Sequence, residues 1–136
     1  MEIADSEVFR LVLEAEIRRY ASRPVDLLIV DDIAQWAATR KGNAKGNPVA
    51  MAITDGETSA WGILLCRQID AAWVSSVISR REFGGFLRTR DVLHTPEIFL
   101  RHVVILELAH LENNWGQEHE EDCDAWAFDK LGINAI

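Results

Sequence analysis

The residues best suited to chemistry lie in the stretch ILELAHLENNWGQEHEEDCDAW, residues 105–126. A carboxylate and an imidazole, Glu107 and His110, are three residues apart and would be neighbours on one face of a helix. A His at position 106 would complete H-E-x-x-H, the helix in which two imidazoles hold zinc and the Glu acts as general base. The sequence has Leu106 there, and an alkyl side chain cannot bind a metal.

A second group of polar residues follows after a short turn. Four residues are spaced at i, i+3, i+4 and i+7 and therefore share one helix face, namely Glu120, Cys123, Asp124 and Ala127. We expect a short connection to bring this face against Glu107 and His110. The alternative is that Glu107 and His110 form a structural pair in the core, because buried polar side chains need partners.

The two segments together resemble the core of the minimal gluzincin metallopeptidases, particularly the HtpX-like and ImmA/IrrE-like groups. In these groups H-E-x-x-H is followed by a helix of the form E-x-x-A-D-x-x-A-x-x-x-L, and residues 120–131 read EEDCDAWAFDKL. The resemblance implies that Glu107 is the catalytic base and that His110 and Glu120 are metal ligands. It implies that Asp124 is the acid that orients a ligand imidazole.

Two departures from the family pattern bear on the metal. Leu106 removes one of the three protein ligands that a catalytic zinc site keeps. Cys123 replaces the Ala of the pattern, and it is either a substitute soft ligand or a small buried hydrophobic residue. His102 cannot replace the missing ligand, because it precedes His110 by eight residues, about 12 Å along a helix.

We expect the first half of the chain to alternate helices and strands. Asp5 or Ser6 begins a helix that ends before Pro24. The apolar side of this helix is predicted to contain Val8, Leu11, Val12, Ala15 and Ile17. The apolar run 24–30 indicates a buried strand, and the two Asp residues after it predict a helix over 33–41.

The middle of the chain carries a hairpin signal. Gly42 ends the preceding helix, and the loop GNAKGNP follows. Two apolar runs, 49–54 and 58–66, are separated by Asp-Gly-Glu, which predicts a β-hairpin. The run 69–79 has two readings, either one helix throughout or a third strand around 72–75 followed by a short helix.

The strongest helix signal is Thr95 followed by Pro and Glu, which is typical of a helix start. The helix that follows is predicted to end at Gly116, and because it is apolar nearly all round it should be central and buried. A last helix is predicted from near Gln117 to Gly132. The expected fold is a single α+β, zincin-like domain over residues 1–136, with a small antiparallel or mixed sheet packed against the motif helix and the C-terminal helix.

Composition narrows the possible functions. The 136 residues carry a net charge of −8, and between Glu107 and Asp129 there are eight acidic residues but no Lys or Arg. This balance argues against nucleic-acid binding, which depends on clustered basic residues. No apolar run is long enough for a membrane span, and the N-terminus lacks a signal-peptide pattern, so we expect a cytoplasmic protein with Cys66 and Cys123 reduced.

Two functions of different kinds are compatible with these observations. The preferred one is a catalytically inactive metallopeptidase-like protein, without a cofactor, that binds a protein partner with a basic surface, as phage-encoded inhibitors and antitoxins do. The alternative is an active metal-dependent peptidase or hydrolase, with Glu107 as general base and His110, Glu120 and Cys123 as an atypical set of zinc ligands. A third possibility is an unrelated α+β domain.

Overall fold

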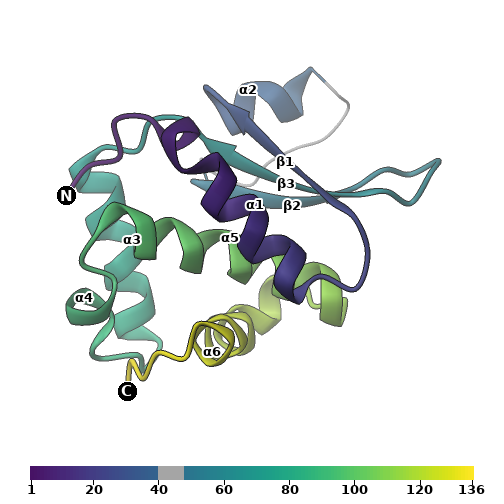
Figure 1. Cartoon of the computed structure of the whole chain (residues 1–136). Coiled ribbons are helices and arrows are strands. Elements are labelled where there is room, and N and C mark those ends of the chain that lie inside the picture. The colour runs from purple at the N-terminus through teal and green to yellow at the C-terminus, as the bar shows by residue number, and fades with distance from the viewer. Residues whose placement is uncertain (40–47) are drawn as a thin grey trace.

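Three strands form a mixed sheet in the order β1-β3-β2 (Figure 1). β1 (Val25–Val30) pairs in parallel with β3 (Trp61–Cys66), and β2 (Ala50–Thr54) pairs with β3 in the antiparallel direction. The computed structural model describes residues 1–39 and 48–136. Within this part of the chain the α+β class and the hairpin are confirmed, and the mixed form of the sheet is established.

β1 differs from its prediction as a buried strand. It lies at one edge of the sheet, where Leu27 is buried but Leu28 is 38% exposed. The guanidinium of Arg10 donates to the Leu27 carbonyl at 2.9 Å, on the side of β1 away from β3. An apolar run does not reveal whether a strand has one neighbour or two, and for this reason the prediction was wrong.

The first helix turns a different face inward from the one predicted. A 3₁₀ turn, η1 (Ser6–Phe9), is capped by the Asp5 carboxylate and leads into α1 (Arg10–Tyr20). Leu13 and Ile17 are buried against α5, whereas Val8 is 76% and Leu11 is 81% exposed. The inward stripe, which also contains Phe9 and Tyr20, buries more apolar area than the stripe of Val8, Leu11 and Ala15 could.

Three further helices lie between α1 and the central helix in the sequence. α2 (Ile33–Ala38) begins at Asp32, whose carboxylate accepts from the Gln35 amide, and the predicted end at Gly42 and the loop to residue 47 lie outside the described residues. α3 (Ala71–Phe83) shows that the ambiguous run is helical, so the alternative of a third strand was wrong. α4 (Thr89–Val92) was not predicted.

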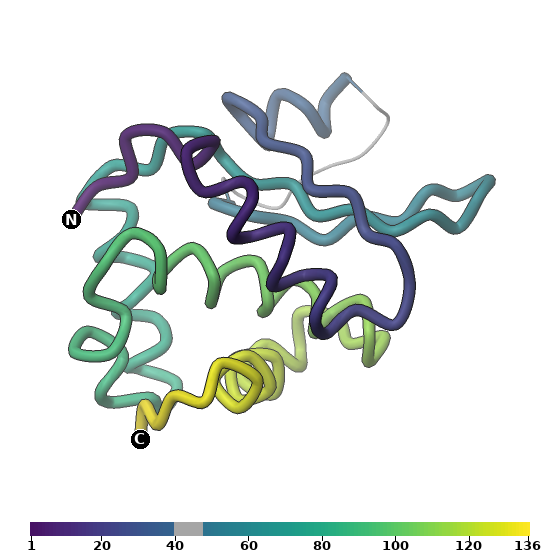
Figure 2. Tube along the Cα trace, viewed as in Figure 1, coloured from purple at the N-terminus to yellow at the C-terminus, as the bar shows by residue number. Residues whose placement is uncertain are grey.

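The central helix is α5 (Pro96–Asn113), which begins at the Thr95 cap as predicted and is buried on most sides. It packs against β2, β3, α1 and α6 (Figures 1 and 2). It ends at Asn114, in the left-handed conformation, two residues before the predicted Gly116.

The C-terminal helix follows a short turn of 3₁₀ helix. This turn is η2 (Gln117–His119), and it leads into α6 (Glu120–Leu131), which ends at Gly132 with a φ of 69° as predicted. α6 packs along α5, on the side of that helix away from the sheet (Figure 1). None of the described helices is both long and apolar enough to cross a membrane.

Candidate functional site

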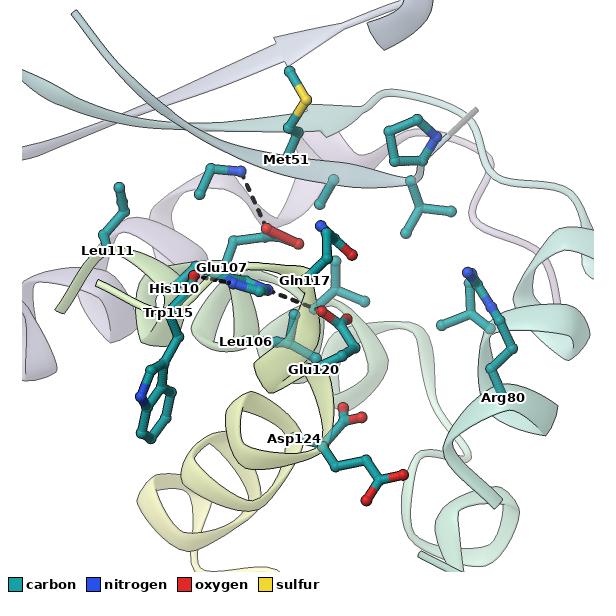
Figure 3. Close-up of a pocket in the computed structure, with 18 of the residues that line it drawn as sticks. Met51, Arg80, Leu106, Glu107, His110, Leu111, Trp115, Gln117, Glu120 and Asp124 are labelled. Carbon is teal, nitrogen blue, oxygen red and sulfur yellow. Dashed lines mark hydrogen bonds and ion pairs between the residues drawn. The ribbon is translucent and has the colours of Figure 1, made fainter. Parts of the chain in front are cut away.

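A cleft of about 1230 Å³ opens between β2, the C-terminal half of α3, α5 and the start of α6. Its lining includes the residues that the sequence singled out, namely Leu106, Glu107, His110, Glu120 and Asp124. Figure 3 shows these side chains with β2 above them and Arg80 of α3 on the opposite wall. The two helices are therefore brought together as the spacing of their polar residues predicted.

The imidazole of His110 uses both of its nitrogen atoms inside the protein. Nε2 lies 2.9 Å from Glu120 Oε2, and Nδ1 donates to the Trp115 carbonyl at 2.8 Å (Figure 3). The left-handed residue Asn114 turns the chain at the end of α5, and Trp115 directly follows this turn. The sequence predicted the contact with Glu120 but gave no sign of the contact with Trp115.

Electrostatics favour an ion pair between His110 and Glu120. The neighbouring side chains of Cys123 and Glu120 raise the pKa of the His110 imidazole, which is therefore protonated at neutral pH. Burial opposes ionisation of Glu120, but its bond to His110 outweighs burial and lowers the pKa of this carboxyl. Both ring nitrogens of the imidazolium then act as donors, one to a carboxylate and one to a carbonyl.

Glu107 connects α5 to the edge of the sheet. Its Oε2 accepts a hydrogen bond of 3.1 Å from the backbone N–H of Ala52 in β2. Burial raises the pKa of Glu107 to about 7, so that near neutral pH the carboxyl is partly protonated. Among the described residues the hydrogen bonds of Glu107 and His110 go to other partners, so the two side chains do not satisfy each other.

The donors present do not fit a catalytic zinc ion. A catalytic zinc ion keeps three protein ligands, whereas the side chains in direct contact here are two, His110 and Glu120, joined between Nε2 and Oε2. Leu106, 2% exposed, occupies the position of the first ligand, and Cys123 is fully buried with a thiol pKa that burial raises. Within residues 1–39 and 48–136 no group of three or more His, Cys, Asp or Glu side chains is placed to hold a metal.

A buried polar cluster that the sequence did not reveal lies beneath the cleft. Arg81 Nε is 3.0 Å from Asp124 Oδ1 and donates to His102 Nδ1 at 3.3 Å, and Arg81 Nη1 donates to the Val77 carbonyl. Burial raises the pKa of Asp124 to about 6, and burial together with Arg81 holds the pKa of His102 well below its usual value. Asp124 lies beside the imidazole of His102, whose Nε2 is 3.7 Å from Asp124 Oδ1.

β2 presents one edge of its backbone to the cleft. The amide of Cys66 donates to the Val49 carbonyl, and the amide of Asp55 donates to the Ala60 carbonyl. The backbone N–H and C=O groups of the odd-numbered residues of β2 therefore point towards β3. Successive residues of an antiparallel strand alternate in direction, and the even-numbered residues therefore face away from β3. The Ala52 N–H bonds Glu107, whereas the polar backbone groups of Ala50 and Thr54 have no hydrogen bond to a described residue.

A scan against protein-family models finds no family that matches this chain, and searches of curated proteins and of solved structures also return no match. The cleft, its charged side chains and the end of β2 are therefore the features that bear on function.

Proposed function

We propose that this protein is a catalytically inactive, zincin-like and metallopeptidase-like protein that binds a protein partner in the cleft. The observation that carries the proposal is Leu106, a buried alkyl side chain that lines the cleft with Glu107 and His110 and cannot bind a metal. The proposal is supported by the contact between α5 and α6, which brings Glu107, His110 and Glu120 to one cleft. Leu106 and the adjacent Val103 fill the space of the missing ligand with apolar side chains.

In this proposal a proton takes the place of the metal between His110 and Glu120. Two ligands that bind one tetrahedral zinc at about 2 Å each lie roughly 3.3 Å apart. His110 Nε2 and Glu120 Oε2 are 2.9 Å apart, which is the distance of a charge-assisted hydrogen bond. The helix pair is thus held by an ion pair that needs no metal, and Glu107 has no activated water from which to remove a proton.

The walls of the cleft favour an extended peptide segment as the bound part of the partner. The backbone groups of Thr54, at the exposed end of β2, point away from β3 and can pair with such a segment, as in recognition by strand addition. Phe83, at the rim, is 96% exposed and offers an aromatic contact. Close to the cleft, η2 exposes Glu118 and the start of α6 exposes Glu121 and Asp122, which would attract a basic surface beside the bound segment.

Metal content separates this proposal from the alternative of an active hydrolase. We expect the protein, purified after growth with added zinc, to contain far less than one zinc per chain by plasma mass spectrometry. Stoichiometric zinc in the wild type that is lost in His110→Ala and Glu120→Ala would overturn the proposal. It would support a metal-dependent enzyme with Glu107 as base.

Peptide binding tests the cleft itself, with two exposed apolar residues as a matched pair. Phe83 lines the cleft, whereas Leu87 is 71% exposed and lies outside it. A library of short extended peptides, basic and acidic, would be screened by fluorescence anisotropy. We expect Phe83→Ala to weaken the binding of the selected basic peptides and Leu87→Ala to leave it unchanged. Equal effects of the two substitutions, or the absence of any binding, would contradict the proposed site.

A further inference from the structure

The carboxyl group of Glu107 lies in the cleft with one oxygen atom unused. Its Oε2 accepts the hydrogen bond from the Ala52 N–H at 3.1 Å, whereas Oε1 has no hydrogen-bond partner among the described residues. Figure 3 shows this carboxyl group extending from α5 toward β2, among the other residues that line the cleft. A carboxylate oxygen is an acceptor with two lone pairs, so the free oxygen can accept a hydrogen bond from a bound molecule.

The cations closest to Glu107 are paired with other carboxylates. His110, on the same helix, lies 2.9 Å from Glu120, and Arg81 of α3 lies 3.0 Å from Asp124. β2 contributes no charged side chain, since it reads AMAIT. Burial outweighs the effect of both cations and raises the pKa of Glu107 to about 7, and the charge of Glu120 acts in the same direction as burial. Within the described part of the chain, the ionised Glu107 therefore has no counterion of its own.

The other charged side chains of the cleft are exposed. Arg80 lies on α3, on the opposite wall, and Glu121 lies in the first turn of α6 (Figure 3). Water and salt screen such exposed charges, so that neither of them compensates the charge of Glu107. Among the residues described, the buried charge of the cleft that lacks a counterion is therefore negative, and a complementary ligand presents a cation to it.

The single free oxygen favours an ammonium group over a guanidinium group. Arg binds a carboxylate best through two parallel hydrogen bonds, one to each oxygen, but Oε2 of Glu107 is already bonded to Ala52. A Lys ammonium is a compact charge that needs only one oxygen. Its apolar stem can lie along Ile53 and Trp61, which line the cleft at the end of β2.

We propose that the segment bound in the cleft inserts a Lys side chain whose ammonium group pairs with Glu107. This inference rests on the proposed binding of an extended segment at Thr54. Thr54 follows Ala52 by two residues, about 7 Å along a strand, and the four-carbon stem of Lys reaches about 6 Å. Because Glu107 occupies the Ala52 N–H, backbone pairing with β2 ends there, and a Lys at this end of the segment meets the carboxylate.

A positional peptide library tests the proposal with the intact chain at pH 8, where Glu107 is ionised. N-acetylated peptides of about five residues, alternating Val and Thr and labelled at the C-terminus, would carry Lys, Arg or norleucine at each position in turn. Fluorescence anisotropy would give their dissociation constants. At one position we expect Lys to bind at least about tenfold more tightly than norleucine, because a hydrogen bond between charged groups contributes that much. At the same position Arg should bind more weakly than Lys.

Glu107→Gln identifies the group that recognises the ammonium. Gln keeps the shape of the side chain and can accept the bond from Ala52, but it removes the charge. We expect the preference for Lys over norleucine to disappear in this variant. Glu121→Gln, the same substitution at an exposed position of the same cleft, is the matched control and should leave the preference unchanged. Circular dichroism verifies that each variant is folded.

The results separate a failure of this pairing from a failure of the proposed function. Peptides that bind without a preference for Lys, or with a preference that Glu107→Gln retains, would overturn the pairing with Glu107 but leave the peptide cleft. A norleucine peptide with a free N-terminal amine that binds as tightly as the acetylated Lys peptide would overturn the assignment to a side chain. If none of the peptides binds, the proposed cleft and the inference that rests on it are both wrong.

Discussion

Replacement of Glu107 by Gln should stabilise the protein at pH 8 and have little effect near pH 4.5. Gln has the same shape, and its amide oxygen can still accept the hydrogen bond from the Ala52 N–H. It removes only the charge, which burial makes unfavourable in the folded protein. The effect of the substitution therefore measures what the carboxylate of Glu107 costs in folding free energy.

The magnitude follows from the raised pKa of Glu107, about 7 in the folded protein against an ordinary value of 4.5. Between these two values the unfolded chain has released the proton while the folded chain keeps it, so folding stability falls as pH rises. Each pH unit in the window corresponds to about 1.4 kcal/mol, which gives a ceiling of about 3 kcal/mol above pH 7. Because Glu107 retains some contact with solvent in the cleft, we expect about 2 kcal/mol.

Urea and thermal unfolding of both proteins at pH 4.5, 6 and 8 would measure this difference. At pH 8 we expect the melting temperature of Glu107→Gln to exceed that of the wild type by about 5 to 10 °C, and the gain to disappear at pH 4.5. Glu57→Gln, in the exposed hairpin turn, is the control and should change the free energy of unfolding by less than about 0.5 kcal/mol at each pH. A Glu107→Gln variant that is destabilised at every pH, or stabilised equally at all three, would refute the reasoning.

Two further predictions concern the helices of the cleft. Leu106→His should give a protein that retains about one zinc per chain after dialysis, as measured by mass spectrometry. Adding Glu120→Gln to this variant should abolish zinc binding. If Leu106→His binds no zinc, the result counts against the zincin-like assignment. Asp124→Asn should raise the free energy of unfolding by about 2 kcal/mol at pH 8 in urea titrations, because the raised pKa of Asp124, about 6, means that burial of its carboxylate costs more than the ion pair with Arg81 compensates. Glu97→Gln breaks a more exposed ion pair and should change the free energy of unfolding by less than about 0.5 kcal/mol. Similar effects of the two substitutions would therefore contradict the role of burial.

Local signals were sufficient to predict several elements. The start of α5 depends on the side chain of Thr95 and on the following proline, which act on backbone groups within one turn. The contact between His110 and Glu120 could be predicted because only a short turn separates the two helices, which leaves few ways to pack them. These features depend on residues close together in the sequence.

The features that could not be predicted depend on distant residues. Arg81 meets His102 and Asp124, which belong to two later helices, and the helix that carries it was ambiguous because its apolar residues fit both a strand and a helix period. The inward face of α1 is determined by its packing against α5. The exposure of β1 is determined by its position at the edge of the sheet. The pKa of Glu107 depends on burial, which sequence spacing does not reveal.

The bond from Arg10 to the Leu27 carbonyl has a consequence for assembly. A sheet with two open edges can add strands on both sides, and chains that pair in this way grow into filaments. Here a side chain interrupts each edge of the sheet near its middle, Arg10 at the Leu27 carbonyl of β1 and Glu107 at the Ala52 N–H of β2. The sheet of one molecule therefore cannot pair along either edge with the sheet of another, and only the exposed end of β2 at Thr54 stays open to a short bound segment.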